Sequence, residues 1–315
     1  MQFADHRDIV RGLGADSIVL LKNNKLLPIN KGKIALFGAG AVDTLFHGIF
    51  YNNVCTDKNV SVCEGLVNNG FTITTGSWLA KMEKAVKQQR IESKQKDTFE
   101  ECIGITPEVP ISAADLAESV LGTKTCIYVI RHGITAKNTD DYYQLTEVEQ
   151  SNIKIVAETF ENVILVLNSS MLEISQVARM KNVKAILYMG VPGMEAGNSL
   201  ADVLTGAVNP SGHLTCTWAK KYKDYSTCYS PAIISKSEKT KEIDYKEGIY
   251  VGYRYFDTFD VAPLYPFGYG LSYTTFDMEL EYLEASWMAV VLRVKVTNTG
   301  NHAGREVVQV YCSQP

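Results

Sequence analysis

The sequence predicts an α/β protein with a mostly parallel sheet and helices on both faces, followed by an aromatic linker and a partial antiparallel β-sandwich. Three observations lead to this prediction. Short apolar segments alternate with helix-like stretches, an aromatic segment follows them, and two alternating strand-like segments come last. We place the boundaries at residues 1–225 for the α/β sandwich, 226–284 for the linker and aromatic strap, and 285–315 for the partial β-sandwich.

Compact apolar segments recur along the first of these regions. The chain opens with mixed helical spacing and passes into the apolar run 17–21, which breaks at Asn23 before Pro28. Further segments typical of buried strands begin at Lys33, Gly70, Thr125, Asn162 and Val183. Helix-like stretches lie between them, at residues 61–69, 78–96, 112–121, 146–160, 171–180 and 194–204. This alternation predicts βαβ units and therefore a parallel sheet.

Two of the predicted helices carry start signals. Ser112 is followed by Asp115, and Thr146 by Glu149, at the spacing of a capping box. In parallel sheets of this kind, ligands bind beyond the carboxyl ends of the strands. Those ends are predicted at residues 37–43, 131–136, 168–170 and 190–195.

The composition and the hydrophobic pattern of the chain change after its last predicted helix. Residues 207–218 predict a turn and a short strand, whereas residues 220–246 are polar and rich in Lys, Ser and Tyr, as is typical of a linker. Residues 288–300 and 305–312 alternate in hydrophobicity around an Asn-Thr-Gly turn and predict two antiparallel strands. A seven-stranded sandwich needs about 100 residues, so we expect the domain that starts here to be incomplete.

The aromatic strap spans residues 244–276. It has neither a helical stripe nor sustained strand alternation, and Pro263, Pro266 and Gly268 interrupt its second half. We therefore interpret it as an ordered loop that follows the surface. Aromatic rings give such a loop a large contact area at a small entropy cost, so it either ties two domains together or lines a sugar-binding face. Composition favours the first role.

Composition excludes several classes of protein. A formal net charge of −4 and a pI near 5.8 give no general electrostatic reason to bind nucleic acid or an anionic membrane. The densest basic run, residues 81–96, has helical spacing and is interpreted as a solvated helix face. Neither a signal peptide nor a membrane-spanning run is visible, and we expect a cytoplasmic protein.

Cysteine and glycine patterns argue against a metal or a cofactor. The seven cysteines are widely spaced and form no CxxC pair, which argues against a disulfide framework and a zinc site. Gly38, Gly40 and Asp43 partly match a dinucleotide fingerprint, but the third glycine is missing. We therefore expect no cofactor and no metal, and a nucleotide-dependent α/β enzyme stays only a distant alternative.

Two runs within and around the strap resemble a known family. EGIYVGYRYFDT begins at Glu247 and PFGYGLSYTTF begins at Pro266, and both are similar to the closing signature of the α/β-sandwich domain of glycoside hydrolase family 3. The turn VLLKN…LP near the start and NPSG at residues 209–212 resemble further parts of the same domain. The resemblance implies that the last segment opens a fibronectin-III-like domain.

The same resemblance implies a function. Members of this family that are β-glucosidases hydrolyse terminal β-linked glucosyl or related residues by a retaining mechanism, which needs two carboxylates about 5 to 5.5 Å apart. The nucleophilic Asp comes from a (β/α)8 barrel, and no barrel sequence is present in this chain. Because a methionine directly precedes the sandwich, we expect the front part of a permuted member, with a β-linked oligosaccharide or glycoside as its substrate. The chain alone should hydrolyse such a glycoside very poorly.

The family's acid/base Glu lies in many members on a loop of the form R-x-S-G-E-G-x-D. The corresponding loop here, RHGITAKNTDDYY, starts at Arg131 and has Ile134 and Thr135 where the Glu would fall. Asp140 and Asp141 are the nearest carboxylates, although their position before a helix also favours a structural turn. The catalytic residues therefore remain unknown.

Other residues on these loops are weaker candidates. The side chain of histidine is well suited to proton transfer near neutral pH, so His132 is a third candidate acid/base, although a packing role is commoner for a single histidine. By their place on the two loops, Arg131, His132 and His47 are predicted to contact substrate. The loop around His47, FHGIFYNNV, has aromatic residues where the resemblance implies glycines, so part of the cleft should be remodelled. Glu195 opens a helix, where its charge favours a capping role over a sugar contact.

Two classes of function stay open. The chain is either a module of an active glycoside hydrolase or a non-catalytic sugar-binding or assembly module on the same fold. The exposed strands of an incomplete β-sandwich should also make the isolated chain prone to association, so a homo-oligomer is one possibility.

Overall fold

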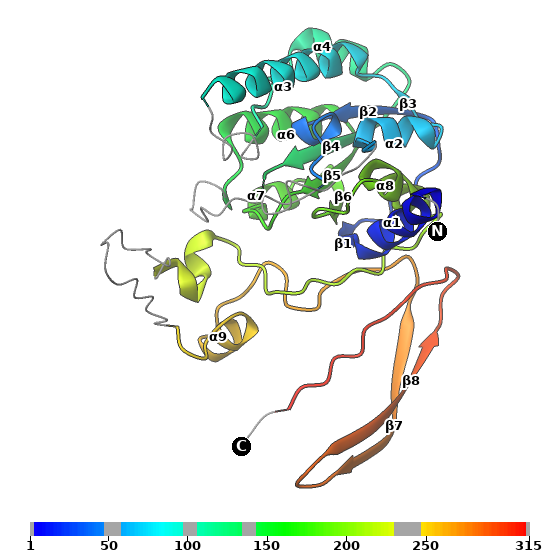
Figure 1. The fold of residues 1–315 in the computed structure, drawn as a ribbon, viewed down its shortest axis with the longest axis vertical. Coiled ribbons are helices and arrows are strands. Elements are labelled where there is room, and N and C mark those ends of the chain that lie inside the picture. The colour runs from blue at the N-terminus through cyan, green and yellow to red at the C-terminus, as the bar shows by residue number, and fades with distance from the viewer. Residues whose placement is uncertain (1–2, 47–57, 97–105, 134–142, 230–246, 313–315) are drawn as a thin grey trace.

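The computed structural model describes residues 3–46, 58–96, 106–133, 143–229 and 247–312. Its centre is a six-stranded sheet with the strand order β1-β6-β5-β4-β2-β3 (Figure 1). The strands are β1 (Val19–Asn23), β2 (Lys33–Phe37), β3 (Thr72–Ile73), β4 (Thr125–Arg131), β5 (Asn162–Asn168) and β6 (Val183–Tyr188). All neighbours are parallel except β1 and β6. β2 and β4 pair directly, with Leu36 opposite Ile127, so the mostly parallel sheet is confirmed.

Helices cover both faces of this sheet. α1, α2 and α8 pack against one another on one face, and the other face carries α3, α4, α6 and α7. Their bounds are α1 (Phe3–Ser17), α2 (Val62–Asn68), α3 (Gly76–Lys96), α4 (Ala113–Ser119), α6 (Glu147–Thr159), α7 (Ser175–Ala178) and α8 (Ala196–Thr205). Close packing of α2 on α8 depends on Gly65, because a Cβ there would collide with the backbone of Gly197. In the described part of the chain, no helix is both long enough and apolar enough to cross a membrane.

The predicted helix starts are confirmed. Ser112 and Asp115 form a complete capping box at α4, as do Thr146 and Glu149 at α6. A third box, at Ser61, begins α2 and was not predicted. The helix expected at 171–180 is shorter than its pattern suggests, because only α7 is helical there.

The aromatic strap lies along the sandwich, as expected. Its residues 264–273 run beside residues 209–219, and the hydroxyls of Tyr269 and Tyr273 donate hydrogen bonds to the sandwich carbonyls of Leu21 and Val203. Two local predictions were wrong. The strand expected within 207–218 is reduced to an isolated bridge between Trp218 and Tyr265, and the strap contains a short helix, α9 (Tyr253–Thr258).

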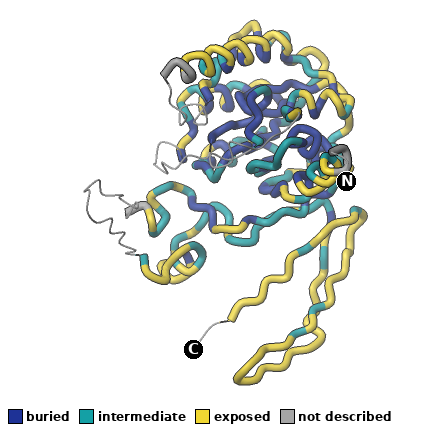
Figure 2. The backbone as a smooth tube through the Cα atoms, in the orientation of Figure 1, coloured by how far each residue is buried: buried dark blue, intermediate teal, exposed yellow. Residues whose placement is uncertain are grey.

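A two-stranded hairpin projects away from the sandwich beyond the strap (Figure 1). β7 (Phe276–Ala285) pairs antiparallel with β8 (Val290–Asn298). The strand predicted at 288–300 is therefore present, but its partner is β7, inside the segment expected to be linker. Residues 305–312, predicted as its partner, carry no strand assignment. The hairpin is largely exposed, whereas the sheet is buried (Figure 2).

Candidate functional site

The carboxyl ends of β2, β4, β5 and β6 form one edge of the sheet. The chain turns sharply after β2 at Gly38, whose φ of 92° suits glycine and where a Cβ would collide with the backbone of Val129. The turn leads into the 3₁₀ helix η1 (Ala39–Ala41) and then to Asp43. It thereby places the residues after β2 against the end of β4.

Asp43 is the centre of one buried polar group at this edge. It is 8% exposed, and it accepts hydrogen bonds from Arg90 of α3 at 2.6 Å and from the Thr106 hydroxyl at 2.7 Å. Arg131, at the end of β4, is 6% exposed and places its Nε 3.4 Å from the same carboxylate. Burial lowers the pKa of Arg131, and the charge of Asp43 opposes this effect. Asp43 therefore joins three distant segments of the chain.

His132 and Glu149 form a second buried pair beside this group. His132 Nε2 lies 3.0 Å from both Glu149 oxygens, and the two residues are each 1% exposed. Glu149 also accepts hydrogen bonds from the backbone N–H and the hydroxyl of Thr146, both at 2.8 Å. One carboxylate thus caps α6 and holds the imidazole that follows β4.

Asn168 fixes the edge at the end of β5. Its Oδ1 accepts a hydrogen bond from Leu45 N–H at 2.5 Å, and its Nδ2 donates to the carbonyls of Leu45 and Gly190 at 2.8 and 2.7 Å. The side chain is completely buried. It therefore ties the segment after η1 to the segment after β6.

Glu195 does not act as predicted. It occupies the N-cap position of α8, but its side chain makes no capping hydrogen bond. Instead it forms an ion pair with Arg7 of α1 and accepts a hydrogen bond from Asn198 Nδ2 at 2.6 Å. The reason is that a nearby arginine offers a charged donor, which binds a carboxylate more strongly than a backbone N–H does.

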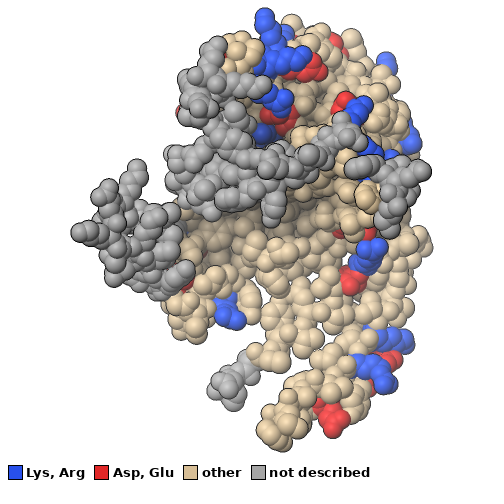
Figure 3. Space-filling model, in the orientation of Figure 1, with Lys and Arg blue, Asp and Glu red and all other residues tan. Residues whose placement is uncertain are grey.

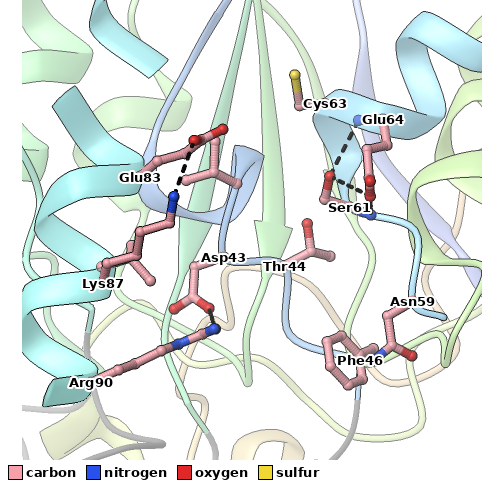
Figure 4. Close-up of a pocket in the computed structure, with 12 residues that line it drawn as sticks. Asp43, Thr44, Phe46, Asn59, Ser61, Cys63, Glu64, Glu83, Lys87 and Arg90 are labelled. Atoms are coloured by element: carbon pink, nitrogen blue, oxygen red, sulfur yellow. Dashed lines mark hydrogen bonds and ion pairs between the residues drawn. The ribbon is translucent and has the colours of Figure 1, made fainter. Parts of the chain in front are cut away.

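A cavity of about 510 Å³ opens beside Asp43, between η1, α2 and α3 (Figure 4). Its wall mixes polar and apolar side chains and contains the Asp43–Arg90 pair and the longer Lys87–Glu83 pair. Asn59 Oδ1 also lies at this wall, where it is buried and has no hydrogen-bond partner among the described residues. On the face shown in Figure 3, basic and acidic side chains are intermixed, as expected for a solvated α3.

The predicted site residues divide into two groups. His47, Asp140 and Asp141 lie outside the described residues. Arg131 and His132 lie together at the predicted edge, but each has an internal partner and little exposed surface. Their contacts with substrate, and proton transfer by His132, stay predictions. The described residues contain no cluster of His, Cys, Asp and Glu suited to a metal ion.

The parallel sheet, its polar carboxyl edge and the strap define the fold class as an α/β sandwich. Residues 18–253 match the model of the glycosyl hydrolase family 3 C-terminal domain. The chain therefore belongs to glycoside hydrolase family 3, as the resemblance of the strap motifs implied.

Several β-glucosidases are similar to nearly the whole chain. Probable beta-glucosidase L of Aspergillus fumigatus is 32% identical over 342 residues, which cover 99% of this chain and 44% of that protein. Thermostable beta-glucosidase B of Acetivibrio thermocellus is 32% identical over 319 residues, covering 97% and 38%. Beta-glucosidase 3B of Thermotoga neapolitana, solved in complex with alpha-D-glucose, superposes with a TM-score of 0.79 at 30% identity, covering 94% and 42%. The chain thus spans less than half the length of these relatives.

Proposed function

We propose that this chain forms the sandwich part of a β-glucosidase-type glycoside hydrolase, which cleaves terminal β-linked glucosyl or related residues with retention. The observation that carries the proposal is the similarity of almost the entire chain to proteins named β-glucosidases. The chain covers only the matching part of these relatives, so a (β/α)8 barrel is proposed as the partner that supplies the nucleophile.

The side chains at the carboxyl edge support the proposal that this chain forms one wall of the active site. A retaining reaction needs one carboxylate free to attack and one free to exchange a proton. Asp43, Glu149 and Glu195 are each engaged by internal donors, so none of the three is free for either task. Within this proposal, these residues shape the edge, and the reacting groups belong to residues outside the described ranges or to the barrel.

A chimera tests the proposal. The matching region of the Acetivibrio thermocellus enzyme is replaced by this chain, and hydrolysis of 4-nitrophenyl β-glucoside and of cellobiose is measured. We expect turnover of the aryl glucoside, whose leaving group departs without protonation, and none of the matching α-glucoside. The chain alone is the control and should be inactive. A folded chimera that binds glucose but turns over neither β-glucoside would contradict the proposal.

A second candidate is a non-catalytic sugar-binding or assembly module. Ile134 and Thr135, which stand where the family's acid/base Glu would fall, favour it. In the chimera, azide tests whether this chain supplies an acid/base. If the acid/base is missing but catalysis occurs, azide should accelerate the aryl glucoside reaction and give glucosyl azide. If Asp140, Asp141 or His132 has taken over the role, its Ala variant should lose about 10² to 10⁴ in cellobiose hydrolysis.

A further inference from the structure

Residues 106–112 form a strut that connects the carboxyl edge with α6. At one end, the Thr106 hydroxyl donates a hydrogen bond to Asp43. At the other, Asn152 of α6 accepts from Ile111 N–H at 3.0 Å and donates to the Val109 carbonyl at 3.0 Å. Glu108 lies between these two anchors, and its carboxylate is the group that reaches η1.

The carboxyl group of Glu108 is held in an unusual place for a charge. Its Oε2 accepts a hydrogen bond from Ala39 N–H at 2.9 Å, at the first residue of η1. The residue as a whole is only half-buried, but Oε1 is inaccessible to solvent and has no hydrogen-bond partner among the described residues. The buried hydroxyl of Tyr128, which lies within interaction range of Glu108, also lacks a partner there. The Tyr128 hydroxyl can donate as well as accept, so a hydrogen bond between it and Oε1 suits either protonation state of Glu108. The neutral form is favoured because an ionised Oε1 would be buried, with no cation beside it among the described residues.

Among the described residues, the groups that act on Glu108 include no cation. β4 presents Tyr128, α6 presents the carboxylate of Glu149 together with the amide of Asn152, and η1 presents only the Ala39 N–H. The imidazole of His132 is bound to Glu149. Burial, with a smaller contribution from the charge of Glu149, raises the pKa of Glu108 to about 8. An ordinary carboxyl would be ionised well below that pH.

We propose that Glu108 is a positioning residue that holds a proton in the folded protein, and that this proton keeps the strut and η1 in place at the carboxyl edge. The neutral carboxyl can accept from Ala39 N–H and donate to the Tyr128 hydroxyl at the same time. The ionised form cannot donate, and it stands beside Glu149, so it gains by moving toward water. Such a movement would pull on η1 and on the Thr106 contact with Asp43. The proposal does not depend on the glycosidase function.

The proton is tested by comparing the whole chain with its Glu108→Gln variant, whose amide keeps one acceptor and one donor. In the wild type, an infrared band of a protonated carboxyl should persist at about pH 7, where ordinary carboxyls are ionised. The variant should lack this band. Absence of the band from the wild type would overturn the proposal.

The pH dependence of stability gives an independent measurement. The folded pKa is raised from 4.5 to about 8, so the folded state binds more protons than the unfolded state between these values. The equilibrium constant for unfolding of the wild type should therefore rise, relative to Glu108→Gln, by up to about tenfold per pH unit across this window and level off above it. Glu158→Gln, on the exposed side of α6, is the matched control and should track the wild type. If the ratio of the unfolding equilibrium constants of the wild type and Glu108→Gln did not change with pH, Glu108 would not hold a proton in the folded state.

The positioning role is tested by amide hydrogen exchange. Glu108→Ala removes the acceptor of Ala39 N–H, whereas Glu108→Gln keeps one. We expect faster exchange at residues 39–43 in the Ala variant and near wild-type exchange in the Gln variant, with β5 unchanged in both. Equal protection of Ala39 in all three proteins would show that Glu108 does not hold η1. If the Ala variant fails to fold, protection of Ala39 in Glu108→Gln at alkaline pH, compared with its loss in the wild type, decides the same question.

Discussion

The carboxyl edge of the sandwich and the β7–β8 hairpin show opposite ways of using polar and apolar side chains. At the edge, Asp43, Glu149 and Asn168 are buried and each has several protein partners. In the hairpin, the two strands pair along their length with one register shift, but Trp287 and Met288 at the turn are 91% and 73% exposed, and the whole hairpin is mostly exposed (Figure 2). The edge is thus stabilised by contacts between distant segments, and the hairpin by contacts with itself.

An ion pair therefore contributes differently to stability in the two regions. The Asp43–Arg131 pair is almost completely buried, whereas the Lys295–Glu279 pair of the hairpin, at 3.6 Å, joins side chains that are 56% and 70% exposed. Water screens the exposed pair, whereas removing one member of the buried pair takes a charge away from a partner that water does not reach. The sandwich and the hairpin also each contain a tryptophan, Trp218 and Trp287, so matched substitutions can test the comparison.

Trp218→Ala should have the largest effect. The ring is fully buried, packs edge-on against Tyr188 and Tyr265, and donates a hydrogen bond from Nε1 to the Leu172 carbonyl at 2.8 Å. Its loss should cost about 3–5 kcal/mol in the free energy of unfolding, measured with urea. Trp218→Phe keeps most of the apolar contact and should cost less. A loss below about 1 kcal/mol in Trp218→Ala would mean that the strap does not depend on this residue.

Asp43→Asn should have the next largest effect. It removes the negative charge that faces the buried guanidinium of Arg131, and we expect a cost of about 3 kcal/mol, because the amide oxygen still accepts one hydrogen bond. Glu279→Gln, the matched change in the hairpin, should cost less than about 1 kcal/mol. Both are measured by urea unfolding at low and high salt. Similar costs for the two variants would remove the distinction between the regions.

The fold was predictable where local pattern and burial agree. The strands from β2 to β6 are compact apolar segments, and the boxes at Thr146 and Ser112 mark helix starts, so the βαβ order followed from the sequence. β7 was missed although its apolar and polar residues alternate, because the segment was assigned to the linker and aromatic strap at residues 226–284. α9 was missed because its aromatic residues pack as part of the strap and form no apolar stripe at helical spacing.

The site was less predictable, because its contacts join segments that are distant in sequence. Thr146 and Glu149 were identified as a capping box, but no local pattern indicates that His132 binds the same carboxylate. Asp43 was noted only as part of a weak glycine fingerprint. Its hydrogen bonds to Arg90 and Thr106 form because segments that are distant in sequence meet in the fold. The carboxyl-edge rule indicated where these polar side chains gather, but not which of them would be used in internal pairs.

Trp287→Ala should have the smallest effect on stability. The side chain is 91% exposed at the β7–β8 turn, so the folded state buries little of it, and the free energy of unfolding should change by less than about 0.5 kcal/mol. Self-association should respond instead, because Trp287 and Met288 form an exposed apolar tip and large exposed apolar groups favour association. Sedimentation velocity over a concentration series should show less association in Trp287→Ala than in the wild type. Glu279→Gln should leave association unchanged at moderate salt. If Trp287→Ala instead costs more than about 1 kcal/mol, its ring makes a folded-state contact in solution, and the contrast with Trp218 would fail.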